Sequence, residues 1–421
     1  MGVSGAAGGT AIVPGSVGRT SIALMASYDI GLLVRYGPGT IALSSTMSVV
    51  NDSGGPVDRV ELETIAARLG HMTLGAVAVD GRRVMAMISD QTIVVPLGGI
   101  LPAGASVTIR LSYRATLRRD LAGSDWLFTK ANGIVDLYRF IPWISLRRRF
   151  DRPNYGDPFF TASSPRVRLT VTTDRPLTIA ATGHRVAGSR LVQVFEASDV
   201  RDLTVTASPF YRVTSSSVGS TTVRVIAKAG YPTATVLRYA RSFLAREGDL
   251  VGRYPYSMFT VAQSAGGDGM ESPQLIWIPG GLSGSHLRWL VAHETAHQWF
   301  YGIVGSDQAL QPFADEAVAD ELARYVSGIR RASRCSPQPL DRSIYRYSNA
   351  CYFEVIYVQG STFLDQIRAR IGTAVFWSAL RGYVSDHRYG IGSTRALLQA
   401  LDAASPIDLR PAFSRRFPRL F

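Results

Sequence analysis

The chain has 421 residues, which is too long for one ordinary domain. Of these residues, 46% are hydrophobic and 18% charged, a composition typical of globular proteins with sizeable cores. No apolar run of about eighteen residues occurs, so a transmembrane helix is not expected. The formal charge of +13 comes almost entirely from scattered arginines, with Lys130 and Lys228 as the only lysines and residues 147–149 as the one tight cluster; we therefore expect a solvated basic surface and no nucleic-acid partner.

Residues 1–20 are rich in Gly, Ala, Ser and Val and are expected to form a flexible lead. From residue 21 to 213, short segments of alternating polarity are separated by Gly, Asp and Pro turns. This pattern predicts an all-β N-terminal domain, a sandwich or saddle. The expected strands include Gly39–Val49, Gln91–Pro96, Ser106–Tyr113, Arg166–Thr172 and Asp202–Ala207.

The Ser- and Thr-rich stretch Thr214–Ser220 is a compositional break and the expected domain boundary. A second domain, residues 221–421, should begin with a mixed sheet and continue mainly as helices, which gives an α+β fold. The expected strands are Thr222–Lys228, Ser257–Ala262 and Leu275–Ile278, and the expected helices are Ala234–Arg246, Ser285–Tyr301, Phe313–Tyr325, Gly360–Ile371 and Thr394–Asp402.

The helix expected at Ser285–Tyr301 carries His293-Glu294-Thr295-Ala296-His297. Histidines four apart share one helix face, so both rings can reach one Zn²⁺ at about 2.0–2.1 Å. Glu294 between them has the position of a base for a metal-activated water. Glu316 on the next helix would be the third ligand and leave one coordination position open, as in catalytic zinc sites.

The alternative is a surface helix with two unconnected histidines, but the apolar neighbours of the motif favour a buried wall. Asp320 lies four residues after Glu316 and can accept the second ring N–H of a ligand histidine. A solvated helix charge is an equally good interpretation of Asp320. The four remaining histidines show no ligand spacing and are interpreted as ordinary surface or core residues: His71, His184, His286 and His387.

Together these residues resemble the zinc aminopeptidase N family of the gluzincin clan, in a short form without the large helical C-terminal domain. Val291–Phe300 matches the zinc helix of that family, and Glu316 has the spacing of its third ligand. Asp268-Gly-Met-Glu-Ser272 is similar to its Gly-Ala-Met-Glu-Asn segment, and Tyr357-Val-Gln-Gly360 resembles its Tyr-x-Lys-Gly element. The blocks Gly156-Asp-Pro-Phe159 and Val200-Arg-Asp-Leu203, leading to Tyr211, are similar to its N-terminal domain.

The resemblance implies a thermolysin-like catalytic domain, one zinc ion and peptide substrates with a free N-terminus. Glu294 would act as general base and Tyr357 would stabilise the oxyanion, with Tyr352 competing for that role. Glu271 would pair with the substrate α-ammonium, and Gly269 and Met270 would lie along the bound peptide.

The N-terminal half lacks the Gln-x-Glu element that supplies a second acidic anchor in many relatives, and Asp136 is the nearest candidate. An endopeptidase, another hydrolase such as an epoxide hydrolase, or a non-catalytic zinc-binding scaffold therefore stay open as alternatives. A comparison of N-blocked with N-free peptides separates the two peptidase hypotheses.

Cys335 and Cys351 are the only cysteines and flank a Ser- and Pro-rich loop before Tyr357. A bridge would close a loop of about fifteen residues, stabilise by about 3 kcal/mol and indicate an oxidising compartment such as the cell envelope or exterior. Two free thiols are equally compatible with the sequence.

Overall fold

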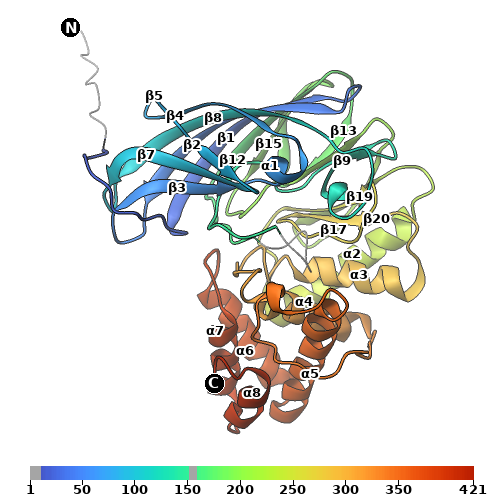
Figure 1. Ribbon diagram of the computed structural model, residues 1–421. Coiled ribbons are helices and arrows are strands. Elements are labelled where there is room, and N and C mark those ends of the chain that lie inside the picture. The colour runs from blue at the N-terminus through green and yellow to red at the C-terminus, as the bar shows by residue number, and fades with distance from the viewer. Residues whose placement is uncertain (1–10, 151–158) are drawn as a thin grey trace.

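The computed structural model describes residues 11–150 and 159–421 (Figure 1). Three β-sheets make up the N-terminal part, and a fourth sheet followed by helices makes up the C-terminal part. The expected α+β fold, with the β part first, is confirmed. Of the two sequence blocks similar to the N-terminal domain of the resembled family, Gly156-Asp-Pro-Phe159 lies outside the described residues except for Phe159.

The largest sheet has eight strands in the order β14-β15-β12-β1-β2-β8-β4-β5. Only β1 and β12 pair in parallel. Along β1 and β2, alternate side chains are buried, as the alternating polarity predicts for a sheet with one face against a core. The strands are β1 Leu24–Arg35, β2 Thr40–Asn51, β4 Thr73–Val79, β5 Arg82–Val84, β8 Ser106–Thr116, β12 Val167–Thr173, β14 His184–Gly188 and β15 Val192–Ala197.

Two four-stranded sheets complete the N-terminal part. One has the order β11-β3-β7-β6 and the other β13-β16-β10-β9. Their strands are β3 Val57–Glu63, β6 Met87–Ser89, β7 Thr92–Leu101, β9 Phe128–Ala131, β10 Ile134–Leu137, β11 Trp143–Ile144, β13 Thr178–Ala181 and β16 Val205–Ser208, with the short helices α1 Ile65–Leu69 and η1 Asp125–Leu127 between them.

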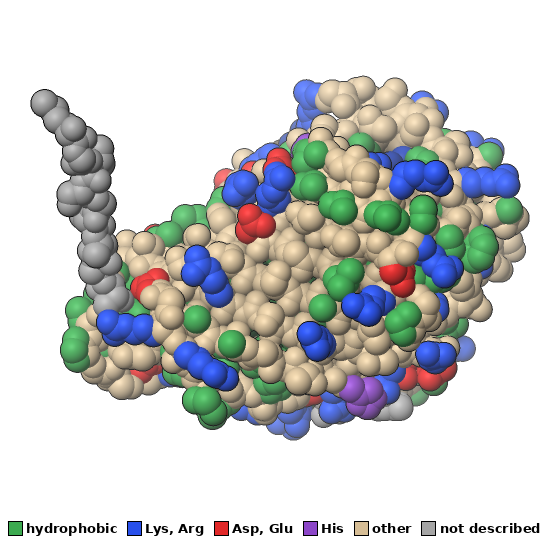
Figure 2. Space-filling view, turned by 90° about the horizontal axis from the view of Figure 1, so that it is seen from above, with side chains coloured by type: hydrophobic (Ala, Val, Ile, Leu, Met, Phe, Trp, Pro, Cys, Tyr) green, Lys and Arg blue, Asp and Glu red, His purple; other side chains and the backbone are tan. Residues whose placement is uncertain are grey.

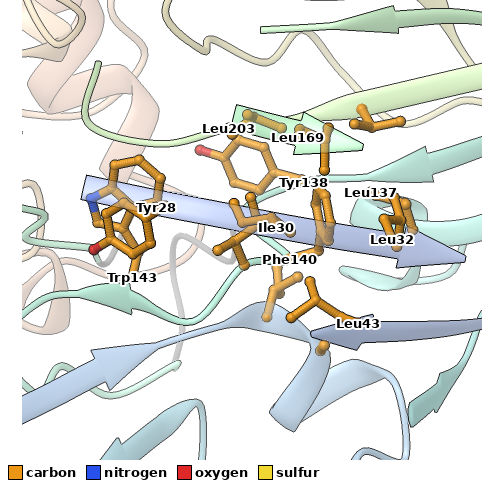
Figure 3. Packing of buried hydrophobic residues seen from close by; sticks show 14 of the residues in the cluster. Tyr28, Ile30, Leu32, Leu43, Leu137, Tyr138, Phe140, Trp143, Leu169 and Leu203 are labelled. Atoms are coloured by element: carbon orange, nitrogen blue, oxygen red, sulfur yellow. The ribbon is translucent and has the colours of Figure 1, made fainter. Parts of the chain in front are cut away.

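The inner face of the large sheet packs against the two small sheets. Tyr28, Ile30 and Leu32 point from β1 into this core, and Leu137 and Phe140 lie close to them (Figure 3). Burial of such aromatic and aliphatic side chains is the main stabilising contribution, about 1.5–3 kcal/mol each. The outer face carries polar side chains. Seen from above, Lys and Arg residues are scattered over this side of the molecule, most of them separated by uncharged residues (Figure 2).

The prediction of a flexible lead is wrong for residues 11–20. Val13 pairs with Ile100 next to β7. The carboxylate of Asp58 on β3 accepts hydrogen bonds from the Ser16 hydroxyl and from the backbone N–H groups of residues 17–19. Burial opposes ionisation of Asp58, but these four donors outweigh it and hold its pKa well below its usual range. Residues 16–19 thus supply hydrogen-bond donors for the carboxylate of Asp58. Residues 1–10 lie outside the described residues.

The stretch Thr214–Ser220, expected as a break, is a strand and the start of a hairpin turn. It belongs to β17 Arg212–Val218, the edge strand of the sheet β17-β18-β19-β20. Its side chains are mostly exposed, which explains why the segment is polar. The turn at residues 219–220 uses Gly219 at a φ of +54°. The other strands are β18 Thr221–Ala227, β19 Met258–Ser264 and β20 Leu275–Pro279.

Helices follow this sheet, and they lie below the β part in Figure 1. They are α2 Thr233–Val251, α3 Gly284–Ala296, η2 Pro312–Ala314, α4 Glu316–Ser327, η3 Ile344–Arg346, the π-helix η4 Glu354–Gln359, α5 Gly360–Ile371, α6 Thr373–Asp386, α7 Thr394–Ala404 and α8 Arg410–Arg416. No helix within residues 11–150 and 159–421 is long and apolar enough to cross a membrane.

Arg201 joins the two parts of the molecule. Its side chain is 1% exposed and donates hydrogen bonds to the carbonyl oxygens of Thr161, Gly302, Ile303 and Gly390. Next to it, the carboxylate of Asp202 accepts hydrogen bonds from the hydroxyls of Ser272 and Tyr301. The second N-terminal sequence block, residues 200–203, is therefore the junction with the C-terminal part.

Glu247 on α2 gives a prediction on stability. It is fully buried, and neither carboxylate oxygen has a hydrogen-bond partner among the described residues. Burial raises its pKa well above the usual range, against smaller opposing effects of His297 and Arg246. The unfolded chain then loses this proton near pH 4.3 while the folded protein keeps it. Each further pH unit, up to the folded pKa, should cost about 1.4 kcal/mol of stability.

We expect Glu247→Gln to remove this loss. The difference between the denaturation midpoints of the variant and the native protein should be larger in favour of the variant at pH 8 than at pH 5, because the amide cannot ionise. Chemical denaturation at several pH values measures the slope of the difference, which a constant packing cost of the amide does not alter. Parallel pH profiles for the two proteins would show that Glu247 is ionised in the folded state.

Candidate metal centre

Helix α3 positions the two histidines of the motif. It begins after Ser283 and ends at Ala296, five residues earlier than expected, with His297 as its C-terminal cap residue. The chain then turns sharply: the N–H of Gly302 donates to the carbonyl of His297, and a Cβ on Gly302 would collide with the carbonyl of Gln298. His293 and His297 still lie one turn apart, both buried.

Three donor atoms converge at this place. Nε2 of His293 and Nε2 of His297 are 3.2 Å apart, and each lies 3.3 Å from Oε2 of Glu316. Donors bound to a tetrahedral zinc ion at about 2.0–2.1 Å are separated from each other by about 3.3–3.4 Å. Oε2 of Glu316 is fully buried and has no hydrogen-bond partner in the described part of the chain. The three residues therefore fit a zinc ion.

The charges of the site also suit a cation. Burial opposes ionisation of Glu316, but His297 and His293 outweigh it and hold its pKa well below the usual range. Burial likewise disfavours charged His297, yet Asp315 and Glu316 outweigh this and raise its pKa well above the usual range. A metal ion at this site would therefore displace a proton from His297.

Asp315 contacts the candidate ligand His297, a contact that the sequence suggested for Asp320. Oδ1 of Asp315 lies 2.8 Å from Nδ1 of His297, and the carbonyl of Phe300 lies 2.9 Å from the same nitrogen. Such a contact fixes the ring so that the other nitrogen faces the metal. Sequence reasoning missed Asp315, although it directly precedes Glu316.

The expected hydrogen bond of Asp320 to a ligand histidine does not form. Its Oδ1 lies 3.8 Å from Nδ1 of His293 and instead accepts from Trp289 and Arg331, while Oδ2 accepts from Ser361. The one-turn spacing of Glu316 and Asp320 puts both on one helix face, but the indole N–H of Trp289 donates a hydrogen bond to the carboxylate of Asp320 in place of His293. The solvated interpretation is wrong as well, because Asp320 is 3% exposed.

Glu294 is 4% exposed, and one of its carboxylate oxygens lies within 4.8 Å of a ring nitrogen of His297. Its Oε2 has no hydrogen-bond partner in the described ranges. Burial raises its pKa well above the usual range, an effect that His297 partly opposes. Gly269 leaves the space that this carboxylate fills, because a Cβ there would collide with Oε1 of Glu294. The glycine thus serves a protein carboxylate, a reason that the sequence did not indicate.

Residues 268–272, which include Met270 and Glu271, lie beside β20 and pair with it through one isolated antiparallel bridge. Met270 and Trp277 exchange backbone hydrogen bonds of 3.2 and 2.8 Å. This pairing puts Glu271 near Glu294 and His297, and one oxygen or nitrogen of each lies within 4.8 Å of the others. In the set that contains Glu316, the donor atoms lie 3.2–3.3 Å apart, close to the spacing expected around a tetrahedral zinc ion, so this set is the candidate metal site.

Glu271 already has protein partners. Its Oε1 lies 3.3 Å from Nη2 of Arg139 and accepts from Gln308 at 3.2 Å. Burial raises the pKa of Glu271 to about 7, although His297 and Arg139 favour the charged form. Asp136 does not reach the site: it is buried on β10, where its carboxylate accepts from Thr206 and from the N–H of Ala265. It is therefore a structural residue, and Arg139 is the residue of this segment beside Glu271.

Tyr357 lies in the π-helix η4, an element that occurs frequently at functional sites. Its ring stacks on His293 with centroids 5.3 Å apart. The ring of Tyr352 lies behind it, 6.0 Å from Tyr357, and Tyr352 is fully buried.

A disulfide joins Cys335 to Cys351, next to this segment, so the bridged alternative is the one in the structure.

No family model and no curated protein matches this sequence. Several solved structures match it. A mutant of an M1 zinc metallopeptidase from Deinococcus radiodurans, bound to a Tyr-Ser-Ala substrate, is 21% identical, with a TM-score of 0.71 and 98% of each chain covered. An M1 zinc metallopeptidase from the same organism is 23% identical, with a TM-score of 0.68 over 94% of this chain and 93% of that chain. A two-domain mutant form bound to L-tryptophan is 22% identical, with a TM-score of 0.68 and 94% coverage of both. At this identity the likeness establishes the fold.

Proposed function

We propose that this protein is a zinc-dependent aminopeptidase that removes N-terminal residues from peptides. The observation that carries the proposal is the triangle of His293, His297 and Glu316, whose donor atoms are 3.2–3.3 Å apart. When bound there, one zinc ion supplies Lewis-acid polarisation of a peptide carbonyl and acidification of water. The shared fold with M1 zinc metallopeptidases supports this proposal.

Glu294 is the general base. Its carboxylate lies beside the donor triangle, within reach of a water that attacks the peptide carbonyl, and it then passes the proton to the leaving amine. Burial raises the pKa of Glu294 well above the usual range of a glutamate, which makes the carboxylate a stronger proton acceptor. Gly269 keeps the space around this carboxylate open.

Tyr357 donates a hydrogen bond from its phenol to the oxyanion that forms during attack. One such donor typically lowers the barrier by about 2.7–4 kcal/mol. Its contact with the ring of His293 supports this role, because it places the tyrosine directly beside one of the proposed metal ligands. Tyr352, five residues earlier, packs behind Tyr357 and has a structural role.

Glu271 binds the α-ammonium of the substrate, and Gly269 and Met270 lie along the N-terminal residue of the bound peptide. The ligands of the similar structures support a free amine as the recognised group, since Tyr-Ser-Ala and L-tryptophan each carry one. Pairing of an amine with Glu271 would favour removal of single residues over internal cleavage.

Glu271→Ala tests this role. We expect the variant to lose about 10- to 100-fold in kcat/KM on aminoacyl anilides, because a hydrogen bond to a charged group contributes about 1.5–3 kcal/mol. N-acetylated anilides, which cannot use the anchor, should be cleaved as poorly as by the native protein, and zinc content should not change. Equal cleavage of N-acetylated and free-amine substrates by the native protein would favour an endopeptidase. Cleavage of neither substrate would favour a non-catalytic scaffold.

The disulfide supports a location in an oxidising compartment, such as the cell envelope or the exterior. Such bridges are rare in reducing cytosol. Trapping of free thiols in cells, followed by mass measurement of the protein, tests this location: the native protein should take up no label on Cys335 and Cys351.

A further inference from the structure

The two oxygens of the Glu271 carboxylate have different surroundings. Oε1 lies within hydrogen-bond range of three protein donors: Gln308 Nε2 at 3.2 Å, Arg139 Nη2 at 3.3 Å and the hydroxyl of Tyr138 at 3.5 Å. No residue in the described part of the chain donates a hydrogen bond to Oε2, and Oε2 is not among the fully buried unpartnered atoms. One oxygen is therefore held by the protein while the other stays available to a ligand.

Gln308 is the residue that links this carboxylate to the metal ligands. Its amide nitrogen donates to Oδ2 of Asp315 at 2.6 Å as well as to Glu271, and its amide oxygen accepts from Arg139 at 2.9 Å. Two carboxylates on one side and a guanidinium on the other fix the orientation of the amide. Gln308 is 2% exposed, so water does not compete for these contacts.

The contacts form one continuous path. From His297, the path passes through Asp315 to the amide of Gln308 and on to Glu271, with each step a hydrogen bond of 2.6–3.2 Å. The proposed metal ligand His297 and the proposed amine anchor Glu271 lie on separate segments, the C-terminal end of α3 and residues 268–272 beside β20. Gln308 lies in the loop between α3 and α4. Its side chain contacts both Asp315, which holds His297, and Glu271 itself.

Arg139 completes the hold on Glu271. Its guanidinium lies 3.4 Å from the carboxylate of Asp202 and packs on the rings of Tyr138, Phe159 and Tyr301 at 4.5–4.9 Å. Its backbone has a φ of +37°, which is sparsely populated for a residue with a long side chain. Such conformations persist where surrounding contacts hold them, and they cluster at functional sites.

We propose that Gln308 is a positioning residue that fixes the free oxygen of Glu271 relative to His297, so that an α-ammonium at Glu271 brings the adjacent carbonyl to the metal centre. This inference rests on the proposed aminopeptidase function. Placement matters because an error of about 1 Å in a reacting group can cost about 100-fold in rate. Arg139 offsets the charge of Glu271, so recognition depends on one directed oxygen, which a primary amine can approach.

Two ligands that differ only at the amine test the proposal: L-leucine hydroxamate and N-acetyl-L-leucine hydroxamate. Both carry the same metal-binding group, and calorimetry on the zinc-loaded protein gives their affinities without turnover. We expect Gln308→Met to weaken the free-amine ligand about tenfold or more, and the N-acetylated ligand less than about twofold. Gln311→Leu is the matched control, since Gln311 lies in the same loop and hydrogen bonds Thr394 instead; it should change neither affinity.

Equal weakening of both ligands by Gln308→Met would overturn the proposal, because Gln308 would then support the metal site as a whole. Unchanged affinities would overturn it too. Gln308→Glu keeps the length of the side chain and removes both N–H donors, so it serves as a second variant if the apolar one does not fold, with the same expected loss. If the native protein itself binds both ligands equally, the amine recognition of the proposed function fails; if the native protein discriminates and both variants keep that discrimination, only the role of Gln308 fails.

Discussion

Replacement of Glu316 by Gln is expected to abolish peptidase activity by removing the metal. The substitution keeps the size of the side chain but removes the charge of the only carboxylate in the donor triangle. Residues that merely support a ligand cost about 10- to 100-fold in metal affinity when replaced, so loss of a ligand should exceed 100-fold. Elemental analysis after dialysis and a zinc titration measure this effect. A chelator should inactivate the native protein in the same way, with recovery on addition of zinc.

The matched control is Glu321→Gln, five residues further along α4. Glu321 is also buried, but it pairs with Arg324 and Arg368 away from the histidines. It should keep stoichiometric zinc. A native protein that retains full activity after complete removal of the metal would contradict the proposed centre. The zinc affinity of the native protein should also fall as pH is lowered, because Asp315 and Glu316 raise the pKa of His297 and a proton then competes with the metal.

Replacement of Glu294 by Gln is expected to separate metal binding from catalysis. The amide has the shape of the carboxylate but cannot accept a proton from water, so the rate should fall by at least about two orders of magnitude. Zinc content should stay stoichiometric, because Glu294 is not one of the three converging donors. The comparison of kcat for native and variant protein on one aminoacyl anilide measures the loss.

The pH dependence gives an independent check on Glu294. At saturating zinc, where metal loss does not contribute, native activity should decline at low pH because the base is protonated, and the residual activity of Glu294→Gln should not show that decline. A variant that keeps most of the native rate would show that another group takes the proton.

Local periodicity explains which parts of this structure could be predicted. The helix at Gly360–Ile371 and the strands β18–β20 agree with the expected ranges to within about two residues, because alternation and helical spacing report directly on burial. The donor triangle was predictable for the same reason. His293 and His297 are one turn apart, and Glu316 stands at the start of the next helix.

Features that depend on tertiary contacts could not be predicted. Whether Asp315 or Asp320 supports a histidine depends on Trp289 and Ser361, which come from other elements and take up Asp320. Residues 214–218 are polar because they form an exposed edge strand, and composition alone cannot distinguish such an edge from a linker. The contacts of Gln308 join three segments that are distant in sequence, and a single glutamine carries no spacing signal.

Arg201 limits how the protein can be divided. The turn that follows the metal-binding helix presents the carbonyls of Gly302 and Ile303 to a guanidinium contributed by the β-rich part. If residues 221–421 were produced alone, these carbonyls would lose their donor, and the turn that supplies Phe300 to His297 would have to rearrange. Removal of the β-rich N-terminal part would therefore disturb the surroundings of His297, even though no residue of the donor triangle would be deleted.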